Sequence, residues 1–231
     1  MSASMGAQAR PDQRIVARDE RELLDAVREV DASGAPLRVV DAVDSPEVAD
    51  FEGCVVQVAT HGITVDESGC DDDDLAFCGG VLVTVAAGEE WDSFVATAVE
   101  RGWVGIERLA GFAGTVGAAT VANLHGFGQS VGDTVAAVRT WDRVRGTARR
   151  LAMIDCDFGE DGSRFLRQRM PDGSGRYVVL DVSFLLRQGD LTDPVTDPEL
   201  ARLAGIEVGE RMSLTAASDL AREHRSNSSA A

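Results

Sequence analysis

The sequence predicts an α+β protein of two subdomains with a ligand cleft between them. A helical pattern followed by strand patterns occurs twice along the chain, beginning at residues 19–34 and again at residues 89–102. A glycine-rich segment, residues 105–128, follows the second helix. Glycine lets a backbone turn sharply or approach a ligand closely. Two helix-and-sheet units in series predict a boundary at which a ligand can bind.

The first unit begins with an amphipathic helix that Gly34 ends. Short apolar runs follow it, and alternation of apolar and polar residues is typical of strands with one buried face. We expect strands at 37–43, 54–59 and 62–67, with the second and third paired as a meander, and two more short strands within residues 75–88, broken at Gly79-Gly80.

The second unit begins with the helix at residues 89–102, whose apolar stripe includes Trp91 and Phe94. Strands are predicted after the glycine-rich segment, at 134–143, 148–159 and 175–189. Beyond Gly189 the chain changes to a Pro/Asp-rich linker and two short helices, the second capped by Ser213 or Thr215.

Composition narrows the class of protein. The chain has 231 residues and a net charge of −17, which argues against nucleic acid or an anionic membrane as a partner. Its four cysteines lack C-x-x-C spacing and its three histidines make a histidine metal site improbable. There is no membrane-length apolar run and no leader pattern at the start, so we expect a cytoplasmic protein with a small-molecule substrate. The oligomeric state is left open.

The glycine-rich segment allows two interpretations. It could cradle a phosphate at the start of a helix, where free N–H groups attract anions. It could equally be a tightly packed turn, helix and turn. It contains neither G-x-G-x-x-G after a strand nor the Gly-Lys-Ser/Thr of a P-loop.

The order G-I-E-x-L-A-G-x-x-G-T-V-G-A-A-x-x-x-N-x-x-x-x-G in this segment resembles the flavin-binding core of the UDP-N-acetylenolpyruvoylglucosamine reductases (UDP-N-acetylmuramate dehydrogenases). The resemblance is clear from Val81 to about Leu186. It implies a two-part FAD-binding fold of the PCMH/MurB type, followed by a substrate domain. In that family FAD relays hydride from NADPH to an enolpyruvyl nucleotide sugar. The residues it places against FAD, if FAD binds, are Gly111, Gly114, Thr115, Val116, Gly117, Ala118 and Asn123.

With this resemblance the chain divides into a disordered N-terminus (1–13), a first subdomain (14–85), a second subdomain with the glycine-rich core (86–189), and remnant helices of a truncated third domain with a disordered tail (190–231).

Two loops depart from the family pattern. The resemblance implies a G-G-G-S-N loop around the FAD diphosphate where this chain has residues 41–45, so Asp41 and Asp44 bring carboxylates to that place. Like charges ~4 Å apart repel by about 4 kcal/mol at an effective dielectric constant of 20. In the C-x-F-G-Y-R-x-S-x-F pattern, Glu160 and Asp161 replace the tyrosine and arginine that meet flavin and substrate. The family's later proton-donating serine segment has no match.

We therefore expect a divergent relative that does not perform the family reaction. In this interpretation the former flavin cleft holds a small molecule without a cofactor, and acid–base chemistry such as isomerisation or cyclisation is carried by His125, Glu160, Asp161, Asp41 and Asp44. Two alternatives remain open. One is an FAD-dependent oxidoreductase with an altered substrate, and the other is a non-catalytic partner protein.

Overall fold

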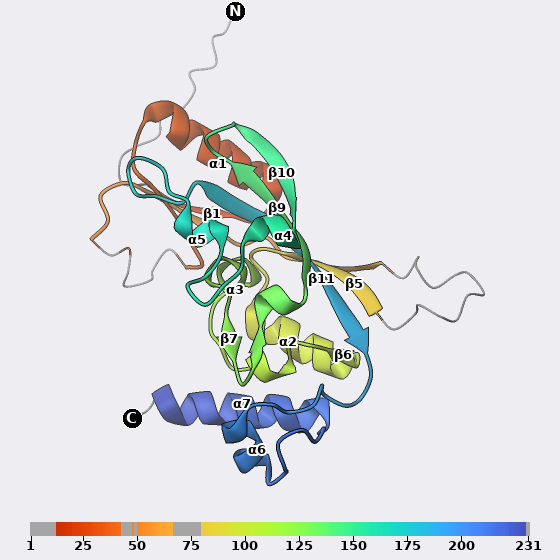
Figure 1. The fold of residues 1–231 in the computed structure, drawn as a ribbon. Helices are drawn as coiled ribbons and strands as arrows, with labels where there is room; N and C mark the ends of the chain where they lie inside the picture. The colour runs from red at the N-terminus through yellow and green to blue at the C-terminus, as the bar shows by residue number, and fades with distance from the viewer. Residues whose placement is uncertain (1–12, 43–47, 49, 67–79, 230–231) are drawn as a thin grey trace, which may run out of the picture.

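The computed structural model describes residues 13–42, 48, 50–66 and 80–229 (Figure 1). Its N-terminal part is a parallel three-stranded sheet in the order β1-β3-β2. The strands are β1 (Arg14–Ala17), β2 (Leu37–Val40) and β3 (Cys54–Val58). Helix α1 (Glu20–Ser33) packs on all three strands.

The boundaries of α1 follow from its end groups. The Asp19 carboxylate accepts a hydrogen bond from the Glu22 amide at 2.8 Å, which satisfies a free N–H of the first turn. Gly34 ends the helix in the left-handed region, with φ of 71°. Leu23 and Val27 are fully buried on the face that contacts the sheet. The helix predicted at residues 19–34 is confirmed.

The second sheet is antiparallel and larger, in the order β10-β9-β11-β5-β4, with β6 also paired to β11. Its long central strand is β11 (Tyr177–Gln188). The others are β4 (Ile63–Asp66), β5 (Gly80–Ala86), β6 (Trp103–Val104), β9 (Val135–Asp142) and β10 (Thr147–Ala152).

The meander expected for the second and third strands is wrong, because β3 and β4 lie in different sheets. Alternation shows that a segment is a strand, but not which strand it pairs with. Although β4 and all but the last residue of β5 fall within the predicted first subdomain, both strands hydrogen-bond within the larger sheet. The short strand expected before Gly79 lies outside the described residues. The domain limits drawn from the sequence stay predictions.

The other elements form a layer below the larger sheet and an end cap (Figure 1). Helices α6 and α7 lie at the end of the molecule opposite α1. The elements outside the two sheets are α2 (Trp91–Glu100), η3 (Glu107–Leu109), α3 (Val116–Ala122), β7 (His125–Gly126), β8 (Gln129–Ser130), η4 (Val131–Asp133), α4 (Met153–Cys156), α5 (Arg164–Arg167), α6 (Pro198–Ala204) and α7 (Leu214–Ser229). Ser213 caps α7, since its hydroxyl accepts from the Ala216 amide.

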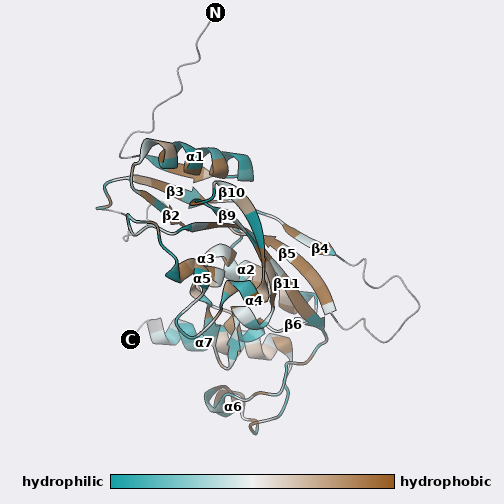
Figure 2. Ribbon diagram, turned by 45° about the horizontal axis from the view of Figure 1, so that its top comes forward, coloured by the Kyte–Doolittle hydropathy of each residue, from teal (hydrophilic) through white to brown (hydrophobic). Residues whose placement is uncertain are grey.

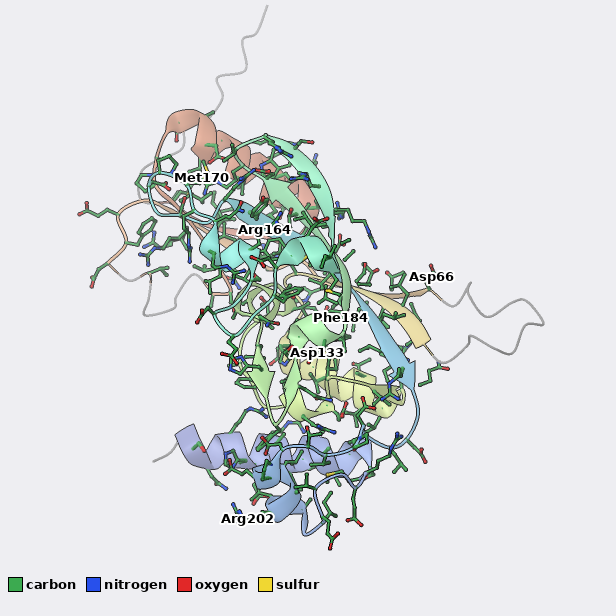
Figure 3. The ribbon with its side chains drawn as sticks, viewed as in Figure 1. Asp66, Asp133, Arg164, Met170, Phe184 and Arg202 are labelled. Atoms are coloured by element: carbon green, nitrogen blue, oxygen red, sulfur yellow. The ribbon has the colours of Figure 1, made fainter. Side chains whose placement is uncertain are left out.

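One hydrophobic core runs through both sheets. Hydrophobic colouring is concentrated on β3, β5 and β11, whereas the outward side of α1 is hydrophilic (Figure 2). Phe184 of β11 packs at 5.1 Å, between ring centroids, from Phe94 of α2 (Figure 3). The buried Trp91 donates its indole N–H to the Leu109 carbonyl at 2.9 Å. None of the described helices is both long and apolar enough to cross a lipid bilayer.

A buried arginine joins three separate parts of the chain. Arg143 directly follows β9, and its guanidinium forms an ion pair with Asp31 of α1 at 2.7 Å. It also donates to the Ser174 hydroxyl and the Gly175 carbonyl, each at 2.7 Å. Arg143 therefore ties α1 to β9 and to the turn before β11.

Arg139 makes a second connection at the other end of α1. Its two terminal nitrogens donate to Glu20 at 2.8 and 2.6 Å, and its Nε donates to Asp181 of β11 at 2.6 Å. The hydrogen bonds from Arg139 hold the pKa of Glu20 below its ordinary value of 4.5.

Replacing Arg143 by Met should lower the free energy of unfolding by about 2–4 kcal/mol, because Asp31 and two further acceptors lose a buried charged donor. Urea denaturation measures this loss. The matched control is Arg145→Met, whose side chain is 56% exposed against 3% for Arg143. The Arg145→Met replacement should lower the free energy of unfolding by less than about 1 kcal/mol. Equal losses in the two variants would contradict this role for Arg143.

The Glu20–Arg139 pair should make stability depend on acidity. Since the folded state lowers the pKa of Glu20, the pair contributes fully above the unfolded pKa of about 4.3, and its contribution is lost as the pH falls through the lower folded value. Below about pH 4 the unfolding free energy should therefore fall less steeply in Glu20→Gln than in the unaltered protein. Denaturation at several pH values tests this, and identical slopes would refute it.

Candidate functional site

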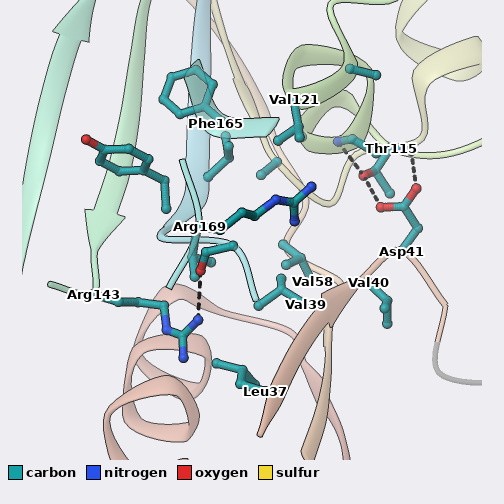
Figure 4. A pocket seen from close by; sticks show the side chains of 18 residues that line it. Leu37, Val39, Val40, Asp41, Val58, Thr115, Val121, Arg143, Phe165 and Arg169 are labelled. Carbon is teal, nitrogen blue, oxygen red and sulfur yellow. Dashed lines mark hydrogen bonds between the residues drawn. The ribbon is translucent and has the colours of Figure 1, made fainter. Parts of the chain in front are cut away.

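An apolar cavity of about 230 Å³ lies between the three-stranded sheet and the layer formed by α3 and the start of β11 (Figure 4). Small-molecule sites are typically apolar clefts with a few polar groups, and this cavity fits that description. Its apolar walls are Leu37, Val39, Val40, Val58, Ala87, Val121, Phe165, Tyr177, Val178 and Val179. Its polar or charged residues include Asp41, Thr115, Arg143 and Arg169.

Asp41 is bonded to the glycine-rich segment. Its carboxylate accepts from the Thr115 hydroxyl at 2.8 Å and from the Thr115 amide at 3.3 Å. Gly114 precedes this contact with φ of +109°, and a Cβ there would lie 2.9 Å from the Asp41 carboxylate. Glycine is therefore required at 114, both by its backbone angle and by the close approach of Asp41. The two donors of Thr115 already hold an anionic group.

The first amides of α3 are used within the protein. Val116 N–H donates to the Glu89 carbonyl at 2.9 Å, and Gly117 N–H to the Ala87 carbonyl at 2.8 Å. Ala118 N–H donates to the Thr115 hydroxyl at 3.3 Å. The sequence pattern suggested free amides for a phosphate, but here these three are satisfied by neighbouring backbone and by the cap.

The remaining predicted site residues lie in a different place. An open depression of about 660 Å³ is lined by Asn123, His125 and Glu160, among others. His125 and Glu160 are exposed, and the His125 Nδ1 lies 3.4 Å from the Asn123 carbonyl. Asp161 is exposed and does not line either cavity. Asp44 lies outside the described residues.

Asn123 holds two loops of that depression together. Its side-chain amide donates to the Gly159 carbonyl at 2.9 Å, and its oxygen accepts from the Gly132 amide at 2.9 Å. Asn123 is 5% exposed and adopts a left-handed conformation at the end of α3, with φ of 48°. The predicted residues that line the inner cavity are Asp41, Thr115, Gly117 and Ala118, whereas those that line the outer depression are Asn123, His125 and Glu160.

The opposite side of the glycine-rich segment is covered by α7. Arg225 of α7 donates to the carbonyls of Arg108 and Ala110, and its guanidinium lies 4.0 Å from the centroid of the Phe112 ring. Burial lowers the pKa of Arg225 to about 10. Gly111 has φ of +83°, and a Cβ there would lie 2.9 Å from the backbone of α7. Gly111 is therefore needed for helix packing, and it does not line the cavity.

The sequence did not indicate the two arginines that line the cavity, Arg143 and Arg169. Both follow the glycine-rich segment, and no motif distinguishes them from the other arginines of the chain. Only the pairing of β9 with β11 and the turn at 169–175 brings them to the cavity wall.

These features define the class of protein. Residues 11–152 match the family model described as "FAD binding domain". The chain is 44% identical over 200 residues to a UDP-N-acetylenolpyruvoylglucosamine reductase of Cutibacterium acnes, covering 86% of this chain and 50% of that protein. It is 39% identical over 195 residues to the reductase of the same name from Thermobifida fusca, covering 84% and 51%.

The chain belongs to the UDP-N-acetylenolpyruvoylglucosamine reductase family of FAD-binding proteins, and it spans about half the length of these curated relatives. Among solved structures, cholesterol oxidase from B. sterolicum shares the fold, with a TM-score of 0.53 at 14% identity over 77% of this chain and 34% of that one. The predicted α+β FAD-binding fold is confirmed.

The expectation of a repurposed, cofactor-independent enzyme is wrong. Identities of 36–44% to several named reductases across most of the chain contradict it and place the chain in their family. The cofactor that the family match supports is FAD, because residues 11–152 match an FAD-binding domain. Identity across most of the chain outweighs a few substituted loop residues.

Proposed function

We propose that this chain binds FAD in the cavity beside Asp41 and acts as a flavin-dependent oxidoreductase on UDP-N-acetylenolpyruvoylglucosamine. The observation that carries the proposal is the 44% identity over 200 residues to a reductase named for that substrate. The chain spans about half of that relative, so both the reductase activity and its substrate are proposed for this chain.

The residues present suit a phosphate-bearing cofactor. The hydroxyl and amide of Thr115 bond a carboxylate at 2.8 and 3.3 Å, and the same donors suit a phosphate oxygen. The cavity of about 230 Å³ is smaller than a typical ligand site of roughly 300–1,000 Å³, so it suits one part of a dinucleotide. FAD, when bound, supplies hydride-transfer chemistry. Thr115 would hold it and the apolar walls would exclude water.

Asp41 limits this site, because its carboxylate occupies the Thr115 donors. Binding of a phosphate there requires Asp41 to move aside. His125 and Glu160 of the outer depression are proposed to face the substrate, since both are exposed and line the same hollow. A small-molecule substrate and a cytoplasmic location remain predictions.

The first test is the visible spectrum of the purified full chain after incubation with FAD and removal of unbound cofactor. We expect flavin absorbance to stay with the protein and to be released by heat denaturation, because the cofactor would be held without a covalent bond. Addition of NADPH should then bleach the flavin bands. A protein that stays colourless after incubation would contradict the proposal.

A second test is Asp41→Asn, which removes the charge but keeps an oxygen that can accept from Thr115. The FAD affinity, followed by flavin fluorescence, should rise by about 10-fold or more, because repulsion of ~2 kcal/mol between like charges is relieved. The matched control is Asp25→Asn, at an exposed position on α1. If the two variants bind FAD equally, Asp41 does not limit the site.

A further inference from the structure

Three charged side chains line the inner cavity: Asp41, Arg143 and Arg169. Two of them are committed to other groups, since Asp41 is held by Thr115 and Arg143 by Asp31. Arg169 differs, because it is an exposed residue of the cavity lining whose guanidinium has no ion-pair or hydrogen-bond partner within the part of the chain that the structure describes. Figure 4 shows the Arg169 side chain extending across the cavity toward the side on which Thr115 and Asp41 lie.

The backbone that carries Arg169 is held in place. Arg169 pairs with Gly175 across a tight turn, in which the Met170 amide donates to the Ser174 carbonyl at 2.8 Å. The Arg143 guanidinium donates to the Ser174 hydroxyl and the Gly175 carbonyl of this turn. The turn is therefore anchored, and it presents Arg169 to the cavity without needing a ligand to fold it.

The cavity also has few donors for an anion. The amides of Val116, Gly117 and Ala118 are satisfied inside the protein, and both donors of Thr115 are bonded to the Asp41 carboxylate. The chain carries a net charge of −17, so an anionic ligand meets an unfavourable general field and needs a local cation. Arginine suits this task, because its planar guanidinium can bond two phosphate oxygens at once.

We propose that Arg169 pairs with a phosphate of the dinucleotide in the inner cavity, and that this charge makes the site select FAD over riboflavin. The proposal rests on the proposed function and adds the residue that determines selectivity for the phosphate. Arg169 supplies a side-chain cation beside a helix whose first three amides, those of Val116, Gly117 and Ala118, are occupied within the protein.

The experiment compares binding of FAD and of riboflavin, which has the same ring system without phosphate, to the full chain by flavin fluorescence. Arg169→Gln should weaken FAD binding by about 10- to 100-fold, the loss expected for a hydrogen bond to a charged group, and leave riboflavin binding unchanged. It should also flatten the dependence of FAD affinity on salt concentration. Arg169→Lys keeps the charge and should retain part of the affinity.

The matched control is Arg202→Gln, which removes the same charge from an exposed position on α6. Figure 3 shows Arg202 at the end of the molecule opposite Met170, the neighbour of Arg169. The control should bind FAD as the unaltered chain does. Since the Arg169 guanidinium has no partner among the described residues, its replacement should leave the unfolding midpoint unchanged.

The outcomes separate the two proposals. If the unaltered chain binds no FAD, the proposed function fails and this assignment fails with it. If it binds FAD but Arg169→Gln binds equally well, or loses riboflavin to the same extent as FAD, the assignment alone is overturned. A loss confined to the phosphate-bearing ligand supports it.

Discussion

The cavity depends on how the three-stranded sheet is held against the rest of the protein, and Arg143 makes the central connection. Its guanidinium bonds Asp31 on α1 and both polar groups of the turn before β11, while its backbone follows β9. One side chain therefore fixes two opposite walls of the cavity and the turn that carries Arg169. A buried arginine with several acceptors is rigid, because each lost bond would leave a charged donor without a partner.

The glycine-rich segment has three structural tasks that are separate from ligand contact. Gly111 lets α7 approach the backbone closely, and Gly117 allows its own amide to reach the Ala87 carbonyl beside a tightly packed Ala87 side chain. Gly114 makes room for Asp41. A segment can thus keep a family pattern through packing alone, while the cavity beside it takes its polarity from Asp41, Thr115 and Arg169.

The expectation of a cofactor-independent enzyme is wrong for a physical reason. The sequence alone presents Asp41 and Glu160 as isolated charges where a diphosphate or substrate would lie. In the structure the Asp41 carboxylate is stabilised by hydrogen bonds from the two donors of Thr115, and Glu160 is exposed and lines the outer depression, not the inner cavity. Asp41 is only partly buried, so its carboxylate can exchange the Thr115 donors for water when a ligand binds, and it excludes a cofactor less strongly than a fully buried charge would.

The sequence by itself determined the local elements and the fold class. Helical spacing and end groups placed α1, and the alternation of β11 identified a long strand. These properties depend on neighbours within a few residues. Only the tertiary structure decided that β4 and β5 join the larger sheet, that His125 and Asp41 belong to different cavities, and that Arg169 points into one of them. Strand pairing and side-chain direction depend on contacts between residues far apart in the chain, and a single sequence carries no local signal for them.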